Sequence, residues 1–412
     1  MIGLAAPPAT LPWLLSGPAA TSGPETLASH VGRLGPQPLG QAGVIGSLRS
    51  AGLRGRGGAR FPAWIKWEAV ARQRRRPVVL VNGAEGEPGS AKDRTLMQLR
   101  PHLVLDGAWL AAETLRATEV VVYVNRHFGD PTDAIAAAIE ERRVVGDRTR
   151  YHLVPASGRY VAGEETAAVR AAGSEEVKPY LTPPRPFERG VAGRPTLVQN
   201  VETLALAALV GRFGADWFRS VGTGDAPGPV LMTIGGHLAH PGVYEIAQGS
   251  RLPDVLRLAG AEPDRLAGVL LGGYFGSWVP AERLDSLTLD DAALTANGLH
   301  LGCGVVLALG RGGCGVTETA RILQYLAGES AGQCGPCIHG LAAMGAACAA
   351  VAAGRGAPDD ILKLRRWAGQ LGSGRGACRH PDGAARLLAS ALREFAWDFD
   401  QHLRHGACGT RL

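Results

Sequence analysis

Two glycine-rich segments that follow one another closely place the strongest constraint on how this 412-residue chain folds. The first covers residues 52–62, and the second covers 82–89, directly after the apolar run 78–81. Glycines lack the Cβ atom that would hold a backbone away from a ligand, and Arg54 and Arg56 add cationic donors beside the N–H groups of the first loop. This composition predicts a cradle for a phosphate group.

The second segment follows residues 78–81, which are typical of a buried parallel strand, so we expect it at the carboxyl edge of a sheet. Its carboxylates Glu85 and Glu87 could accept hydrogen bonds from ribose or ribityl hydroxyls, as an acidic residue does in dinucleotide folds. One glycine-rich loop alone is also a common structural turn. Two in succession favour a nucleotide or flavin site.

Apolar runs typical of strands alternate with helix-like stretches from residue 53 to residue 230. The pattern predicts strands at 78–81, 119–125 and 151–155, and helices at 96–115, 133–142 and 201–210. Such alternation is typical of an α/β fold with a Rossmann-like parallel sheet.

Turn-forming residues and changes of pattern divide the rest of the chain. Residues 1–45 are rich in Pro and Gly, with one short helix expected around 25–31, and a cluster of turn formers at 223–229 marks a boundary. We therefore expect an N-terminal extension (1–45), an α/β domain (46–228), a small α+β unit (229–312), a helical bundle (313–400) and a tail (401–412).

Composition excludes several classes of protein. The chain is 46% hydrophobic, which is ample for buried cores, and its formal charge of +6 favours acidic or phosphate-bearing ligands without the clustered stripe of a nucleic-acid-binding protein. No apolar run approaches the ~18 residues that span a bilayer, and the start lacks a basic secretory signal, so we expect a cytoplasmic protein with no transmembrane segment. Seven cysteines, an odd number, favour metal or cluster ligation over a disulfide framework.

Three further blocks complete a series: Gly-Glu-Glu-Thr at 163–166, Gln-Asn-Val-Glu-Thr at 199–203, and a segment ending in Cys-Gly-Pro-Cys at 329–337. Together with the two loops they resemble the family of flavin-bearing, NADH-oxidising subunits of respiratory complex I, with its relatives in NAD-linked hydrogenases and formate dehydrogenases. The resemblance implies an FMN domain, a ubiquitin-like β-grasp domain of the soluble-ligand-binding (SLBB) type and a helical iron–sulfur domain. The unusual motifs suggest a divergent bacterial side branch.

The resemblance also implies roles for individual residues. Phe61 matches an aromatic residue that stacks on the nucleotide. Glu87, with Glu164 and Glu165, our candidate catalytic residues, matches acidic positions where a carboxylate holds the adenosine ribose or faces the nicotinamide ring. Without the family, Phe61 would be interpreted as a core residue and the two glutamates as a solvated helix start. The expected ligands of FMN and the nucleotide are Gly55, Arg56, Gly57, Gly58, Phe61, Lys66, Asn82, Glu85, Glu87, Gly163, Asn200 and Thr203.

The chain also departs from the family pattern. Ala84 stands where an aspartate is usual, Ala69 where a second stacking aromatic is expected, and Thr182 and Arg185 replace a lysine and a phenylalanine. Arg60 replaces a glycine, and arginine is the residue that accommodates a 2′-phosphate. The nicotinamide nucleotide is therefore expected to be NAD(H) or NADP(H), with the added arginines raising the hypothesis of NADPH.

Cys334 and Cys337 form a C-x-x-C pair, and Cys378 matches the distal cluster ligand of the family. Ala331 occupies the position of the first ligand, so only three of four thiolates are expected. Three alternatives follow: a 4Fe-4S cluster whose fourth ligand is a solvent molecule or a side chain other than the family's first cysteine, a 3Fe-4S cluster, or no cluster, which leaves buried thiols. Candidates for the fourth ligand are His339 and Cys348. We expect the remaining three cysteines to be packing residues: Cys303, Cys314 and Cys408.

The leading hypothesis is an FMN-dependent NAD(P)H dehydrogenase that passes electrons singly to an iron–sulfur cluster and on to a ferredoxin or an iron–sulfur partner subunit. Any association with a membrane would come through such a complex. The alternative is a divergent, non-catalytic paralogue that acts as a flavin-binding or docking component. The substitutions at Ala84, Thr182 and Ala331 favour this alternative.

Overall fold

The structure, a computed structural model, describes residues 14–37, 43–173 and 176–408. The chain forms two compact units, and each is described by itself. The first unit holds the described residues of Met1–Val177, with Thr182–Thr233 and Val243–Ser250. The second unit holds Lys178–Leu181, Ile234–Gly242 and the described residues of Arg251–Leu412. The finer division into five segments stays a prediction.

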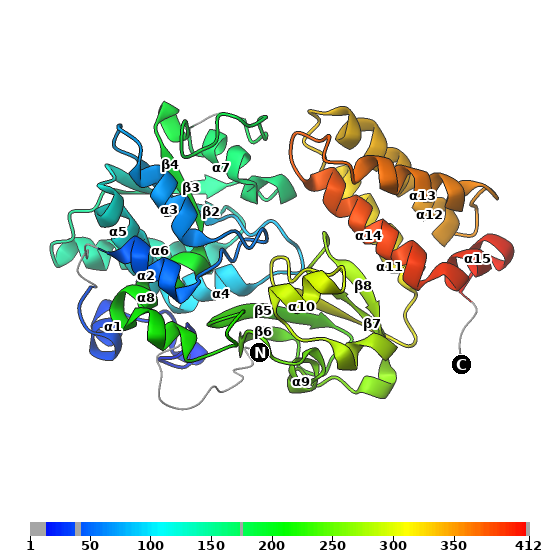
Figure 1. Cartoon of the computed structure of the whole chain (residues 1–412), viewed down its shortest axis with the longest axis horizontal. Helices are drawn as coiled ribbons and strands as arrows, with labels where there is room; N and C mark the ends of the chain where they lie inside the picture. Colours follow the sequence, from blue (N-terminus) through cyan, green and yellow to red (C-terminus); the bar gives the residue numbers. More distant parts are fainter. Residues whose placement is uncertain (1–13, 38–42, 174–175, 409–412) are drawn as a thin grey trace. The chain divides into compact units, whose positions relative to one another are not determined.

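A parallel four-stranded sheet forms the centre of the first unit and confirms the predicted α/β fold (Figure 1). Its strands are β1 (Val78–Gly83), β2 (Glu119–Asn125), β3 (Tyr151–Ala156) and β4 (Thr196–Asn200), in the order β3-β2-β1-β4. Residues 78–81 of β1 are buried on both faces, as the unbroken apolar sequence predicts. Sequence analysis missed β4, whose alternation of apolar and polar residues is short.

The strand order creates a topological switch point beside β1. The chain runs from β1 outward to β2 and β3, and then returns to the other side of β1 as β4. Asn82 of β1 and Asn200 of β4 are register partners at the carboxyl ends of these two neighbouring strands. In open α/β sheets, ligands bind in the crevice at such a point, because the loops diverge there.

Eight α-helices are described in the first unit. Their bounds are α1 (Leu27–Leu34), α2 (Val44–Ala51), α3 (Ala63–Ala71), α4 (Lys92–Leu99), α5 (Pro101–Leu115), α6 (Gly129–Val144), α7 (Glu165–Ala172) and α8 (Val201–Arg219). The prediction of one helix over 96–115 was wrong. Pro101 cannot donate a helical hydrogen bond and instead occupies the first turn of α5, so the chain breaks at Arg100.

Helices α5 and α8 pack in close contact over the sheet. A Cβ at Gly107 of α5 would lie 2.0 Å from the carbonyl oxygen of Leu204 on α8, so only glycine permits this approach. Because the backbones of the two helices are in direct contact here, their packing fixes the position of α8 and of Asn200, which precedes its first turn. Short 3-10 segments lie at Ala20–Ser22, Tyr160–Gly163 and Val191–Gly193.

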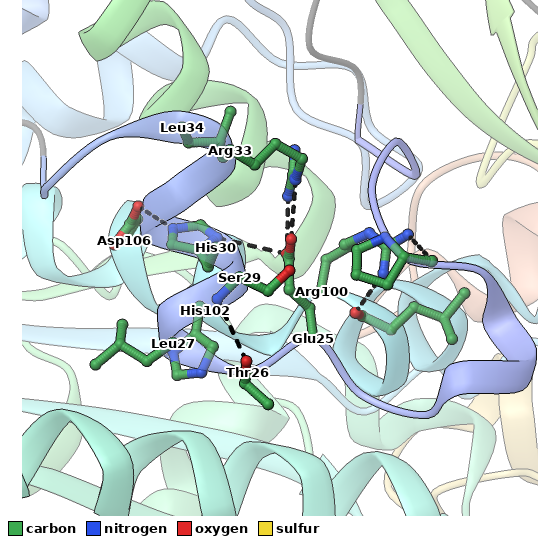
Figure 2. Close-up of polar contacts among 12 residues, drawn as sticks. Glu25, Thr26, Leu27, Ser29, His30, Arg33, Leu34, Arg100, His102 and Asp106 are labelled. Atoms are coloured by element: carbon green, nitrogen blue, oxygen red, sulfur yellow. Dashed lines mark hydrogen bonds and ion pairs between the residues drawn. The ribbon is translucent and has the colours of Figure 1, made fainter.

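A buried ionic cluster attaches the N-terminal segment to this unit (Figure 2). Arg33 of α1 forms a two-pronged contact with Glu25, at 2.8 and 2.9 Å. His30 of the same helix lies 2.9 Å from Asp106 of α5, and Arg142 of α6 donates to the other oxygen of Asp106 at 2.6 Å. Since all but Arg33 are almost fully buried, the contacts of α1 belong to the interior of the first unit.

We expect this cluster to make the first unit sensitive to acid. Burial lowers the pKa of His102 from 6.5 to about 4, and the charge of Arg142 lowers it further. Between these two pH values, the unfolded chain therefore binds a proton at His102 that the folded chain does not bind. Burial alone would raise the pKa of Glu25, but hydrogen bonds from His30 and Arg33 lower it from 4.5 to about 2. Both groups therefore contribute stability at neutral pH that is lost on acidification.

The free energy of unfolding is expected to fall by on the order of 2 kcal/mol through His102 between pH 6.5 and 4, with Glu25 adding to the loss below 4.5. Urea titrations at a series of pH values measure this, and His102→Gln should flatten the upper part of the curve. His152→Gln, at an exposed histidine, is the control and should not. An unchanged slope in His102→Gln would contradict the assignment.

A five-stranded sheet follows, with the order β6-β5-β9-β7-β8. Its strands are β5 (Pro229–Gly236), β6 (Gly242–Ala247), β7 (Leu266–Leu271), β8 (Ser277–Pro280) and β9 (Val305–Gly310), with α9 (Leu252–Leu258) and α10 (Asp291–Ala296) between them. β7 pairs antiparallel with both β8 and β9. Further 3-10 segments lie at Pro263–Arg265 and Ala281–Ser286. The predicted α+β character is present, and the assignment as a β-grasp domain of the SLBB type stays a prediction.

The predicted helical C-terminal part consists of α11 (Gly315–Gly328), α12 (Ala342–Ala352), α13 (Asp360–Leu371), α14 (His380–Glu394) and α15 (Ala396–His405). Trp278 of β8 joins it to the preceding sheet within the second unit. Its backbone N–H donates to Ser390 of α14 at 3.0 Å, and its indole N–H donates to Thr319 of α11 at 2.9 Å. Among all described residues, no helix is long and apolar enough to cross a bilayer.

Candidate functional site

The first glycine-rich loop, between α2 and α3, closes at its base. The Gly55 N–H donates to the Phe61 carbonyl oxygen at 2.8 Å, and Arg54 and Pro62 form an antiparallel bridge. Gly58 has φ +108°, a conformation that favours glycine, and a Cβ there would meet no heavy atom of the described residues within 4 Å. Phe61 is 45% exposed. The loop thus offers open backbone and an accessible aromatic ring.

Arg56 turns inward, contrary to the expectation that its charge lies beside exposed N–H groups. It is 2% exposed, donates to the Pro229 carbonyl oxygen at 2.9 Å, and lies 3.6 Å from Glu202. Its backbone N–H donates to the Thr203 hydroxyl at 2.8 Å. Arg56 and Thr203 therefore fasten the loop to the start of α8, because their polar atoms are directed at each other and at buried partners. Direct contact of either with a cofactor stays a prediction.

The acidic residues of the second loop hold that loop in shape. Glu85 accepts from the backbone N–H of Asp93 at 2.8 Å and so caps the first turn of α4. Glu87 accepts from the Tyr160 hydroxyl at 2.8 Å. A Cβ on Gly86 would lie 2.6 Å from the Tyr160 carbonyl oxygen, so glycine is required where the loops after β1 and β3 meet. The ribose or ribityl contacts of Glu85 and Glu87 stay predictions.

Two asparagines join the loops at the switch point. Asn82 donates to the carbonyl oxygen of Gly163 at 2.9 Å, which connects the β1 loop to the segment before α7. Asn200 caps α8 through its side-chain oxygen and donates its amide to Asp93 at 2.6 Å. A Cβ on Gly57 would touch Asn200 at 3.4 Å. Four predicted site residues, Asn82, Gly163, Asn200 and Gly57, therefore lie together at the carboxyl ends of β1 and β4.

The sequence patterns did not reveal a charged network that lies beside Asn200. Lys92 lies 2.7 Å from Asp93 and 2.8 Å from Glu202, and all three side chains are buried. Burial raises the pKa of Asp93 to about 6, against the lowering effect of Lys92 and with a further rise from Glu85. The available signal was a Lys-Asp pair shortly after the second loop, at the start of a helix.

In the Gly-Glu-Glu-Thr block, Glu164 makes hydrogen bonds within its own helix, and Glu165 forms a partly exposed ion pair. Glu164 is the N-cap of α7 and accepts from the backbone N–H groups of Thr166 and Ala167, both at 2.9 Å. Burial raises its pKa, and the bonds from Thr166 and Ala167 oppose the rise. Glu165 pairs with Lys66 of α3 at 2.7 Å, with both side chains about one-third exposed. Their roles in catalysis and binding stay predictions.

These residues fit a flavin mononucleotide. Open backbone at Gly58, the paired Asn82 and Asn200 at the ends of two strands, an accessible aromatic ring at Phe61 and a lysine, Lys66, that is about one-third exposed all belong to the first unit. Backbone N–H groups and a lysine suit a phosphate, and the ring suits a planar heterocycle. FMN carries both groups.

The cysteines predicted as cluster ligands are brought together in the second unit. Cys334 precedes a π-helical segment, Pro336–Leu341, which carries Cys337. Burial raises the pKa of the Cys337 thiol to about 12, and Cys334 and Cys378 raise it further, so the three sulfurs act on one another. Mutual repulsion of thiolates is what a bound cationic cluster relieves. The residues fit a cluster held by three cysteines, and their assignment as ligands stays a prediction.

The proposed fourth ligands are placed less favourably. Cys348 lies on α12, fully buried, and burial alone raises its pKa to about 12. By contrast, the pKa of Cys337 is also raised by Cys334 and Cys378, and Cys348 is not among the largest influences on it. His339 lies two residues after Cys337 on the π-helical segment. The set of three cysteines, with Ala331 in place of the first ligand, thus stays incomplete.

The expectation that Cys314 and Cys408 are packing residues was wrong. Their sulfurs lie in disulfide contact across a sequence separation of 94 residues, and both also contact His402. One usable hint was present in the sequence, a histidine six positions before the last cysteine. Cys303 stands apart from this group, with its sulfur 3.8 Å from the Gly272 carbonyl oxygen.

Two family descriptions match separate parts of the chain. Residues 48–208 match the Nuo51 FMN-binding domain, which contains both glycine-rich loops, Asn82 and Asn200. Residues 317–402 match the NADH-ubiquinone oxidoreductase-F iron-sulfur binding region, which contains Cys334, Cys337 and Cys378. The predictions of an FMN region and of an iron–sulfur region are confirmed by these matches.

Whole-chain relatives agree with the domain matches. The chain is 31% identical to the second F subunit of the NADH-quinone oxidoreductase of Rhizobium meliloti (strain 1021), with 96% of each sequence covered. It is 32% identical to the NADH-quinone oxidoreductase F subunit of Mycobacterium tuberculosis (strain ATCC 25618 / H37Rv), covering 89% of this chain and 85% of the relative.

Among solved structures, a chain of an NAD+-reducing [NiFe]-hydrogenase in the air-oxidized state superposes with a TM-score of 0.82 at 29% identity. The match covers 88% of this chain and spans 62% of the hydrogenase chain. The prediction of an oxidoreductase of NADH dehydrogenase type is confirmed by these relatives. The chain belongs to the family of NADH-quinone oxidoreductase F subunits.

Proposed function

We propose that this protein is an FMN-dependent NAD(P)H dehydrogenase module that delivers electrons singly to an iron–sulfur cluster and on to an iron–sulfur partner. The observation that carries the proposal is the switch point, where Asn82 and Asn200 are register partners at the carboxyl ends of β1 and β4 and the glycine-rich loop leaves open space beside Gly58. When bound, flavin supplies the exchange between a two-electron donor and one-electron acceptors.

The protein's own residues position the bound ligands. Asn82 and Asn200 fix the loops after β1, β3 and β4, so that these loops keep their arrangement before a ligand enters. Phe61 presents an exposed ring on which a base or nicotinamide can stack. Glu165 holds the Lys66 ammonium in place at 2.7 Å, with the charge still open to solvent.

NADH is the donor that this geometry favours over NADPH. The guanidinium of Arg60 bonds to the side chain of Gln248 and is largely buried, which takes away the cation proposed for a 2′-phosphate. Arg185 is exposed, and its backbone N–H is bonded to Glu188. The relatives' names also specify NADH and NAD+.

Lys66→Met should raise the KM for the nicotinamide nucleotide by about tenfold, as expected for loss of one charge-assisted contact to a phosphate. Steady-state kinetics with a dye acceptor measure it, with flavin content determined in parallel. Arg72→Met is the matched control, because Arg72 is an exposed cation at the end of the same helix, paired with Glu68. Equal KM values for the two variants would argue against a nucleotide at Lys66.

Electron exit is assigned to Cys334, Cys337 and Cys378 in the second unit. An iron–sulfur cluster, when bound there, supplies one-electron transfer. The relatives are named as subunits of larger oxidoreductases, so the acceptor is a ferredoxin or an iron–sulfur subunit. The non-catalytic alternative keeps one favouring observation, the replacement of a cluster ligand by Ala331.

A further inference from the structure

A group of three metal-binding side chains lies in the second unit, outside the sites described above. It contains Cys314, His402 and Cys408, and their ligand atoms all lie within 4.8 Å of one another. His402 Nε2 lies 3.2 Å from the Cys314 sulfur and 3.0 Å from the Cys408 sulfur. Two sulfurs and one imidazole nitrogen thus converge on one point, with Cys314 far in sequence from His402 and Cys408.

Cys314 is placed where a thiolate is favoured. It is the N-cap of α11, a helix of 14 residues, and its sulfur accepts from the Thr317 N–H at 3.4 Å. The positive end of a helix dipole lowers the cost of a negative sulfur. The second cysteine, Cys408, follows α15 and is partly exposed, as is Cys314. A cation could therefore reach the group from solvent.

His402 presents the nitrogen suited to a metal. The ring belongs to α15 and is 4% exposed, with Nε2 directed at both sulfurs. The nitrogen directed at the two sulfurs is therefore the one that would bind a metal.

We propose that Cys314, His402 and Cys408 form a zinc site of the Cys2His type, with a water or another donor in the fourth position. Two thiolates and one neutral imidazole are a ligand set that Zn²⁺ accepts. Binding one Zn²⁺ to two thiols and a histidine releases two protons, which leaves a neutral centre. The metal would tie the end of α15 to the start of α11, across a separation of 94 residues.

A simple disulfide accounts for less of the arrangement. It joins the two sulfurs but gives no role to His402 Nε2, which lies within 3.2 Å of both. Disulfide sulfurs are weak acceptors, whereas thiolates that share a cation with an imidazole draw all three groups together. The group also differs from the predicted cluster ligands, since it uses none of Cys334, Cys337 and Cys378.

The test is metal analysis of the full-length, untagged protein purified without chelator. We expect about one zinc per chain, and X-ray absorption at the zinc edge should show two sulfurs at about 2.3 Å and one nitrogen at about 2.0–2.1 Å. His402→Gln should lower the zinc content by about tenfold or more. Cys303→Ser, at a cysteine outside the group, should keep the zinc, and Cys337→Ser should keep zinc while losing iron.

The absorption spectrum keeps the proposal testable even if His402→Gln does not fold. Zinc-free wild-type protein overturns the proposal, most directly if a non-reduced digest contains a Cys314–Cys408 cross-linked peptide. Zinc with three sulfur neighbours and no imidazole also overturns it, because that pattern places the metal at Cys334, Cys337 and Cys378.

Discussion

Replacing Lys92 by methionine should lower the free energy of unfolding by about 3–5 kcal/mol, the range found when one partner of a buried ion pair is removed. Lys92 lies within 2.8 Å of Asp93 and Glu202, and all three are buried. Methionine fills the space of the lysine stem but leaves Asp93 without this cation and Glu202 with only its longer contact to Arg56 among the ion pairs described above. Urea unfolding followed by tryptophan fluorescence measures the loss.

Two further variants sharpen this prediction. Lys363→Met removes a lysine of an exposed pair with Asp359 and should leave the unfolding midpoint unchanged. The double variant Lys92→Met/Asp93→Asn should recover part of the lost stability, because the carboxylate 2.7 Å from Lys92 is then neutral while Glu202 keeps its contact with Arg56. A Lys92→Met protein as stable as the wild type would show that the network does not support the fold.

Cys337→Ser should abolish the iron–sulfur signal of the reduced protein while the flavin content stays unchanged. Cys337 is buried beside Cys334 and Cys378, and its loss leaves two thiolates, too few to hold a cluster. Iron analysis and electron paramagnetic resonance after dithionite reduction give the readout. Because the FMN region and the cysteines belong to different units, flavin binding serves as an internal check on folding.

Cys348→Ala distinguishes the alternatives for the fourth ligand. The Cys348 thiol is buried in apolar surroundings, and burial raises its pKa to about 12, so we expect its removal to leave the cluster signal intact. Loss of iron in this variant would instead identify Cys348 as a ligand.

Local sequence patterns were sufficient for most of the fold. The apolar run 78–81, the alternation that follows it and the helical C-terminal part each reflect a period that backbone geometry imposes. The helix predicted over 96–115 failed at Pro101, where the missing N–H outweighed a continuous apolar pattern. The strand β4 is short, so its period was too brief to distinguish it from a loop.

The candidate site was only partly predictable. Asn82 could be named because the apolar run before it predicts a strand that delivers a loop to the edge of a sheet, whereas Gly163 and Asn200 were named from the resemblance to the family. The inward orientation of Arg56 could not be predicted from the sequence, because it depends on the buried carboxylate of Glu202, far along the chain. Cys314 and His402 meet only through the packing of α11 and α15, so spacing along the chain carries almost no sign of them.

The measurement that tests the central claim most directly is an anaerobic absorbance titration of the iron-reconstituted protein with NADH and then with NADPH. The account predicts that one equivalent of NADH bleaches the flavin band rapidly, and that NADPH does so at best weakly because Arg60 is bonded to Gln248. A flavin band that neither nucleotide bleaches would contradict the dehydrogenase assignment and favour a flavin-binding paralogue without nicotinamide chemistry.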